Sequence, residues 1–200
     1  MIAFMITVCL LRIAYFISSS NFSHPYFVNA LTGIGVDKNT IVFLSPNIGY
    51  FSFEEEDDLP LDSLPMLLHD DLDVLFSILL SHEIGPFEES LLPTCLSLFP
   101  NESTYLSELI LKMTMYGNFS FYGPMLSLFS SIPHELMLTA KAYLVSGCNA
   151  IKASKILFIH RNTFSYRLNQ FIELTNLDIR DYHNATFLEL YFALSKQKYS

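Results

Sequence analysis

Polar and basic side chains gather in one stretch of this sequence, residues 150–172, for which we predict two short helices joined by a tight turn. At 3.6 residues per turn, the second helix places four apolar residues on one face: Phe164, Leu168, Phe171 and Ile172. Its other faces carry amide, hydroxyl and guanidinium groups, which suit base edges and phosphates. We therefore expect double-stranded DNA to be bound by ten residues: Lys152, Lys155, His160, Arg161, Asn162, Thr163, Ser165, Tyr166, Arg167 and Asn169.

The expected contacts divide by chemistry. Lys152, Lys155 and Arg161 would position the two helices on phosphates. The base edges would be met by the polar residues of the second helix: Asn162, Thr163, Ser165, Tyr166 and Asn169.

Three of the ten side chains also have a second interpretation. His160 is a candidate to shape the turn instead of contacting DNA, and Tyr166 could face a partner domain. Arg167 could hold a phosphate, or it could form an ion pair with Glu173 or Asp178. The sequence leaves these alternatives open.

Capping signals define the elements that must position these side chains. Asn149 is a plausible N-cap for the first helix, and Gly147 would end the helix before it. The buried stripe of the first helix is predicted to be Ala150, Ala153, Ile156 and Leu157. Two helices bury too little surface alone, so flanking helices over residues 136–145 and 182–196 should supply the core. The last of these should be capped by Asp181 and should pack back onto the pair through Ala185, Leu188 and Phe192.

Charge is distributed unevenly along the chain. Residues 134–200 hold eight Lys and Arg against five Asp and Glu, whereas residues 1–133 hold three against fifteen. The net charge of −9 therefore hides a local basic region, and residues 136–172 contain no acid at all. This is the electrostatic pattern that phosphate binding requires.

The segment LFIHRNTFSYRLNQFIELTNLDIRDYHNA, residues 157–185, resembles the C-terminal domain of PucR/CdaR-type bacterial transcription regulators. That family typically shows (F/Y)-(I/V)-H-R-N-T-(L/F)-x-Y-R-L, which is complete here over residues 158–168. A T-G-L-D turn follows in the family, and here Asn176 replaces its Gly; Asn tolerates a left-handed backbone. The resemblance extends over about residues 135–194.

The resemblance implies a cytoplasmic, sequence-specific DNA-binding transcriptional regulator with a helix-turn-helix, and not an enzyme. Because one helix-turn-helix rarely gives enough specificity, we expect a homodimer on paired half-sites. We expect no cofactor, no metal and no membrane association, and the small-molecule effector is not identified by the sequence. Two other classes compete with this one: a shortened, non-DNA-binding interaction module that sequesters full-length relatives, and an enzyme of nucleotide-cyclase descent.

The front half is predicted to alternate strands with helices in the order β-α-β-β-α-β-α. The predicted strands cover residues 6–13, 40–45, 49–54 and 74–81, and those over 40–45 and 74–81 should be buried. The predicted helices cover residues 21–31, 61–68 and 87–99. This order resembles the degenerate GGDEF-like domain, related to nucleotide cyclases, that often precedes the helix-turn-helix in this family. The fold class expected is thus α+β, with an N-terminal α/β domain followed by an all-α one.

The cyclase signature is missing from the hairpin that should carry it. That hairpin is SPNIGYFS, residues 45–52, with neither the acidic pair that holds a metal nor the Gly-Gly that admits a nucleotide. We therefore expect residues 1–100 to form a sensor or dimerisation domain, shortened relative to longer relatives. A helical connector, with helices over residues 103–116 and 124–131, should span residues 101–133, and the helix-turn-helix domain residues 134–196.

Other groups of reactive side chains favour structural roles. The acidic run over residues 54–58 lacks a turn glycine and suits a solvated loop better than a cation site. The group His69, Asp70, Asp71, Asp73, His82 and Glu83 lacks the spacing of known metal motifs. Residues 1–17 are apolar but short for a membrane span and contain Arg12, so a buried strand is favoured over an anchor. Three widely spaced cysteines fit buried thiols in a reducing compartment.

Overall fold

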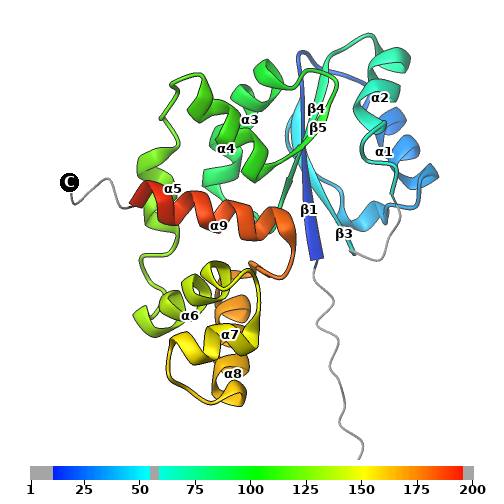
Figure 1. Cartoon of the computed structure of the whole chain (residues 1–200). Helices are drawn as coiled ribbons and strands as arrows, with labels where there is room; N and C mark the ends of the chain where they lie inside the picture. Colours follow the sequence, from blue (N-terminus) through cyan, green and yellow to red (C-terminus); the bar gives the residue numbers. More distant parts are fainter. Residues whose placement is uncertain (1–10, 55–58, 196–200) are drawn as a thin grey trace, which may run out of the picture. The chain divides into compact units, whose positions relative to one another are not determined.

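The computed structural model describes residues 11–54 and 59–195. Within these ranges the chain is a mixed α+β protein with one five-stranded sheet and nine α-helices (Figure 1). It divides into two compact units. The first holds the described residues up to Ile84 together with Leu92–Thr104, and the second holds Gly85–Leu91 and the residues from Tyr105 onward.

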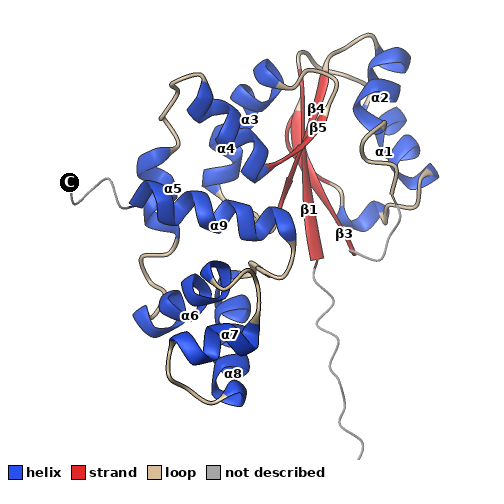
Figure 2. Cartoon of the chain, viewed as in Figure 1, coloured by secondary structure: helices blue, strands red, loops and turns tan. Residues whose placement is uncertain are grey.

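The first unit is built on the sheet, whose strand order is β2-β3-β1-β4-β5. The strands are β1 (Leu11–Ser18), β2 (Val42–Ser45), β3 (Ile48–Glu54), β4 (Phe76–Ser81) and β5 (Ser103–Tyr105). The central strand β1 pairs antiparallel with β3 on one side and with β4 on the other (Figure 2). Its residues Ile13 to Ile17 are all buried, as expected for a strand with an unbroken apolar run that is covered on both faces.

Helices α1 (His24–Gly33) and α2 (Leu64–Leu72) lie on the same side of this sheet (Figure 1). A short 3-10 helix, η1 (Lys38–Thr40), follows α1, and α3 (Pro86–Leu98) follows β4. Packing under α1 is aromatic: the ring centroids of Phe16 and Phe27 are 4.5 Å apart, and those of Phe27 and Phe76 are 6.0 Å apart. Large rings therefore join the central strands to the covering helix.

The β2–β3 hairpin turns at Pro46 and Asn47, between Ser45 and Ile48. Gly49 follows the turn, and a Cβ built there would lie 2.1 Å from the carbonyl oxygen of Val42 and 2.4 Å from the Phe16 ring. Glycine is therefore required at residue 49 by the close approach of the neighbouring strand and ring. In this hairpin glycine serves strand packing.

The second unit is helical beyond residue 105. Its helices are α4 (Leu106–Met115), α5 (Tyr122–Leu128), α6 (His134–Val145), α7 (Ala150–Ile156), α8 (Arg161–Thr175) and α9 (Tyr182–Ser195). Helices α6, α7 and α8 pack against one another, and α9 packs against α4, α5 and α6. The buried ring of Phe129, just after α5, connects the two groups, because it contacts Phe171 of α8 and Tyr191 of α9.

The predicted order β-α-β-β-α-β-α is confirmed, with several corrections to its limits. The described part of the first strand begins at Leu11, and this strand continues to Ser18 instead of ending at residue 13. The strand predicted as buried over 40–45 begins at Val42 and is only partly buried, because it lies at the edge of the sheet with a neighbouring strand on one side only. Residues 103–105, predicted as the start of a helix, form strand β5 because they extend the sheet beside β4.

Candidate nucleic-acid interface

Helix α7 is held at both ends by backbone and side-chain hydrogen bonds. At its start the Asn149 side chain accepts from the N–H of Lys152 at 3.0 Å, which confirms the predicted N-cap. At its end the N–H of Phe158 donates to the carbonyl oxygen of Lys155, and that of Ile159 donates to Ser154, at 3.2 and 3.0 Å. This pair of bonds is a Schellman motif, which stops α7 and reverses the chain toward α8.

Helix α8 begins at Arg161, with His160 as its N-cap residue. The Nδ1 atom of His160 accepts a hydrogen bond from the N–H of Asn162 at 3.2 Å. This contact satisfies one of the backbone donors that a helix start leaves unpaired. The turn-shaping interpretation of His160 is thus supported by a specific bond, and its ring is still exposed.

The apolar face of α8 is buried as predicted. Phe164 and Phe171 are fully buried, and Leu168 and Ile172 are nearly so. The Phe164 ring lies 6.2 Å from that of Tyr143 in α6, measured between centroids. Helix α6 therefore supplies core to the pair, as predicted from the sequence.

The predicted stripe of α7 is wrong at one position. Ile156 is 49% exposed, whereas Ala153 and Ser154 are buried and Leu157 is half-buried. The buried hydroxyl of Ser154 is satisfied because it donates to the carbonyl oxygen of Ile151 at 3.0 Å. Since that hydroxyl has a local partner, α7 can turn its small residues inward and leave Ile156 outside.

The structure brings the ten predicted site residues onto the α7–α8 pair and its connecting turn. Nine of them are exposed: Lys152, Lys155, His160, Arg161, Asn162, Thr163, Ser165, Tyr166 and Asn169. The tenth, Arg167, is half-buried. The first three residues of α8 are all exposed, so the helix start offers guanidinium, amide and hydroxyl groups together.

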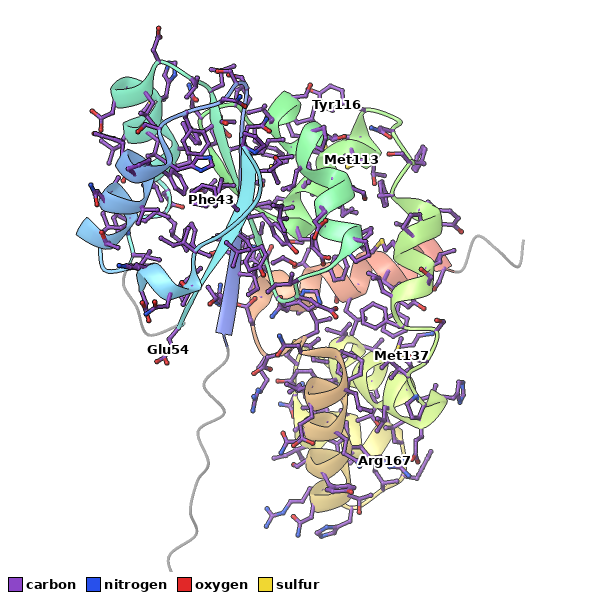
Figure 3. All side chains as sticks on the ribbon, turned by 180° about the vertical axis from the view of Figure 1, so that it is seen from behind. Phe43, Glu54, Met113, Tyr116, Met137 and Arg167 are labelled. Atoms are coloured by element: carbon purple, nitrogen blue, oxygen red, sulfur yellow. The ribbon has the colours of Figure 1, made fainter. Side chains whose placement is uncertain are left out.

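Arg167 has a partner that differs from both sequence candidates. Its guanidinium contacts the carboxylate of Glu135 in α6, with 2.8 Å between Nη2 and Oε2 (Figure 3 labels Arg167). Asp178 instead accepts from Arg180, at 2.8 Å between Oδ1 and Nε, and this bond is the main cause of a raised pKa of Arg180. Glu135 lies directly before the acid-free stretch of residues 136–172. Its ion pair with Arg167 therefore places one negative charge beside the basic helices α7 and α8.

Gln170 of α8, on the polar face of the helix, was not among the predicted site residues. The side-chain amide of Gln170 donates to the Tyr166 hydroxyl at 2.9 Å. The two residues are four apart, the spacing at which helix side chains meet, so this spacing could have identified the pair. The bond holds the exposed Tyr166 ring in place on the helix surface.

The turn after α8 and the start of α9 follow the predicted caps. Asn176 takes a left-handed backbone at φ +52°, and the N–H of Asn184 donates to the Asp181 carboxylate at 3.0 Å. The prediction that α9 packs on the helix pair itself needs correction, since α9 lies mainly against α4, α5 and α6. The apolar face of α9 is long, and α4 and α5 are needed in addition to α6 to bury it.

Elsewhere in the described part of the chain, several reactive side chains form local hydrogen bonds. No group of three or more His, Cys, Asp or Glu among the described residues could hold a metal ion. Asp71 accepts from the Tyr26 hydroxyl at 2.6 Å, and His69 bonds through Nδ1 to the carbonyl oxygen of Val74. Burial lowers the pKa of His82 to about 4.

Residues 1–10 and 55–58, which include Cys9 and most of the acidic run, lie outside the described residues. Across 11–54 and 59–195, no helix has both the length and the apolar character needed to cross a membrane. The other two cysteines, Cys95 and Cys148, are free thiols; Cys95 is buried as expected, whereas Cys148 is exposed.

Comparisons with known proteins identify the C-terminal domain. Residues 136–195 match the family model described as the PucR C-terminal helix-turn-helix domain. The predicted resemblance is therefore confirmed for this part of the chain, which carries the α6–α9 segment described above.

Two relatives with assigned names each match about a third of this chain. This chain is 39% identical over 64 residues to the proline-responsive transcriptional activator PutR of Bacillus subtilis. It is 36% identical over 63 residues to the carbohydrate diacid regulator of Escherichia coli. Each match covers 32% of this chain but only 16% of the relative. A crystal structure of a regulator of polyketide synthase expression from Bifidobacterium adolescentis aligns with 96% of this chain and 82% of its own, at TM-score 0.48 and 16% identity.

Proposed function

We propose that this chain is a sequence-specific DNA-binding transcriptional regulator that acts through α7 and α8. The observation that carries the proposal is the exposure of nine polar or basic residues on one helix pair whose opposite face is buried. The match of residues 136–195 to a helix-turn-helix family supports it. The chemistry is binding, and no catalytic step is assigned to the chain.

Helix α8 would enter the major groove with its first turn toward the base edges. Asn162 and Asn169 offer amides that can pair with adenine, and Thr163 offers a hydroxyl and a methyl group. Lys152 and Lys155 of α7 and Arg161 at the start of α8 would hold phosphates, which fixes the position of α8 in the groove. Arg167 is partly neutralised by Glu135, so we assign it a weaker phosphate contact.

Specific recognition by this unit requires pairing. We propose a homodimer on two half-sites, since one helix-turn-helix contacts few base pairs. The first unit, which we propose to be a degenerate GGDEF-like sensor or dimerisation domain, would support that pairing. We retain the division at about residue 134 between a connector and the DNA-binding domain. A DNA-binding role also implies a cytoplasmic location.

Selection of bound fragments from a genomic DNA library by the full chain tests the proposal. We expect enrichment of fragments that share one sequence with two related half-sites. A matched variant, Asn162→Ala with Asn169→Ala, should lose the sequence preference and keep non-specific binding, because the phosphate contacts remain. If the wild-type chain enriches no fragment and shows no salt-dependent DNA binding, it is an interaction module and the proposal is wrong.

A further inference from the structure

In the described part of the chain, helices α1, α4, α6 and α7 end with the same pair of backbone hydrogen bonds, and α7 has an unusual residue at the position that takes the left-handed conformation. After α1, α4 and α6, the residue in the left-handed conformation that follows the helix is a glycine: Gly35, Gly117 and Gly147. After α7 the equivalent residue is Phe158, at φ +53°. Glycine is the common choice here because it has no Cβ to oppose a positive φ.

A lack of room for a side chain does not explain why all three of these positions hold glycine. A Cβ added to Gly117 or Gly147 would meet nothing within 4 Å. The positive φ alone therefore favours glycine at those positions, and the same cost applies to any bulky residue at 158. Phe158 thus occupies a position where its side chain strains the backbone.

The Phe158 ring gives no packing in return for that strain. It is 96% exposed, more than any other large apolar side chain in the described part of the chain. Its burial within the chain therefore adds almost nothing to folding stability. A bulky residue that strains the backbone and buries no surface is best explained by a contact with another molecule.

The surroundings of Phe158 indicate what that molecule is. The residue lies three positions after Lys155 and three positions before Arg161, in a stretch from 136 to 172 that contains no acid. Both basic side chains are exposed, and the start of α8 follows the turn at once. A partner that approaches this turn must therefore be polyanionic and must also offer apolar atoms.

We propose that Phe158 is a DNA-contact residue, whose ring packs on the apolar atoms of DNA at the edge of the major groove. These atoms are the carbons of deoxyribose and the methyl group of thymine, both of which an aromatic ring can cover. The inference rests on the proposed function, which supplies the bound DNA. It adds an apolar contact to a site otherwise made of polar and charged groups, and it gives a reason for the strained turn.

The test uses the full chain and a fragment recovered by the selection described above. Phe158→Gly and Phe158→Asn both remove the ring and both suit a left-handed backbone. We expect each variant to melt a few degrees higher than the wild type and to bind DNA about ten-fold more weakly, which corresponds to the loss of one apolar contact. The salt dependence of binding should not change, because an apolar contact releases no counterions.

Three control variants separate the ring from the strain. Phe158→Tyr keeps a ring and should keep wild-type affinity. Gly147→Ala places a Cβ at φ +72° in the preceding helix end, so it should lower the melting temperature and leave affinity unchanged. Tyr116→Ala removes another exposed aromatic, 71% exposed after α4, and should change neither quantity.

Each outcome decides the inference. If the wild type binds DNA and Phe158→Gly binds within two-fold of it, Phe158 is not a DNA contact. Dissociation of a dimer by Phe158→Gly in the absence of DNA, seen by sedimentation, would show a protein contact and would also overturn the inference. A wild-type chain without DNA affinity would overturn the proposed function and this inference together.

Discussion

Arg167 shows how a single residue can have two roles that sequence does not separate. Its partner Glu135 lies 32 positions earlier, on α6, and the pair is partly exposed, with side-chain exposures of 29% and 57%. The sequence offered Glu173 and Asp178 because they lie nearby, but contacts between helices depend on how α6 crosses α8. The same limit applies to Phe158, whose exposure follows from the turn geometry and not from residue type.

Removal of the acidic partner tests the role of Arg167. Glu135→Gln should strengthen DNA binding a few-fold, because it releases the guanidinium for a phosphate and removes a nearby negative charge. Unfolding stability should change by less than about 1 kcal/mol, since exposed ion pairs contribute little. Affinity and urea unfolding measure the two effects.

Glu173→Gln is the matched control, because it removes the same charge from α8 at an exposed position. If both variants raise affinity equally, the effect is one of net charge. If Glu135→Gln leaves affinity unchanged, Arg167 is a structural residue and should be removed from the interface.

At the scale of elements, sequence periodicity predicted long helices better than short ones. The stripe of α8 spans several turns, so its buried face was correctly identified at all four positions. Helix α7 has seven residues, too few turns to fix its rotation, and Ile156 was assigned to the wrong side. Strand β5 has three residues, and it exists through pairing with the sheet, which no local pattern encodes.

Two substitutions measure this difference between the helices. Phe164→Ala should lower the free energy of unfolding by about 3–5 kcal/mol, since it leaves a cavity in a fully buried site. Ile156→Ala, at 49% exposure, should change it by less than about 1 kcal/mol. Urea unfolding of both variants gives the comparison, and equal losses would mean that the assigned faces of α7 or α8 are wrong.

The segment after β4 provides a prediction on pH. Burial lowers the pKa of His82 to about 4 from its ordinary value of 6.5, so the folded state keeps this residue neutral. The unfolded chain takes up a proton as the pH falls below 6.5. The contribution of neutral His82 to the free energy of unfolding is therefore complete above pH 6.5. It is lost as the pH falls toward 4, by up to about 3 kcal/mol.

Urea unfolding of the wild type and of His82→Gln, between about pH 7 and pH 4.5, isolates this effect. As the pH falls, the free energy of unfolding of the wild type should decrease more than that of His82→Gln. A difference that stays constant over this range would show that His82 does not titrate on unfolding.

At the scale of the whole molecule, the order of the helices and strands was more predictable than the function of the first unit. The apolar runs and turn signals gave β-α-β-β-α-β-α correctly, because each run must be buried by its neighbours. The role of that unit is not encoded in the same way. The hairpin over residues 45–52 lacks acidic residues, and its Gly49 is required for packing under the Val42 carbonyl.

We predict that the full chain sediments as a dimer, at twice its mass of 22.9 kDa, and that it turns over neither GTP nor ATP with magnesium or manganese. Pairing should bury apolar surface and place two DNA-binding units on one operator. Sedimentation and a nucleotide assay measure these properties separately. A monomer would contradict the proposed pairing, and a cyclic nucleotide product would contradict the absence of catalysis.

Charge is the whole-molecule property most directly linked to DNA binding through α7 and α8. The chain carries −9 overall, so a protein that met DNA through an arbitrary surface should be repelled. If the chain binds through α7 and α8, Lys152, Lys155 and Arg161 displace the counterions of a few DNA phosphates. The salt dependence of affinity counts those phosphates.

The most direct test is the affinity of the full chain for a selected DNA fragment at several salt concentrations, for the wild type and for Arg161→Ala. We predict that the wild type binds more weakly as salt rises, and that Arg161→Ala weakens binding to all sequences alike and lowers the salt slope by about one unit. Lys38→Ala, which removes a positive charge from the first unit, should leave the slope unchanged. An Arg161→Ala chain with the affinity and slope of the wild type would contradict DNA binding through the start of α8.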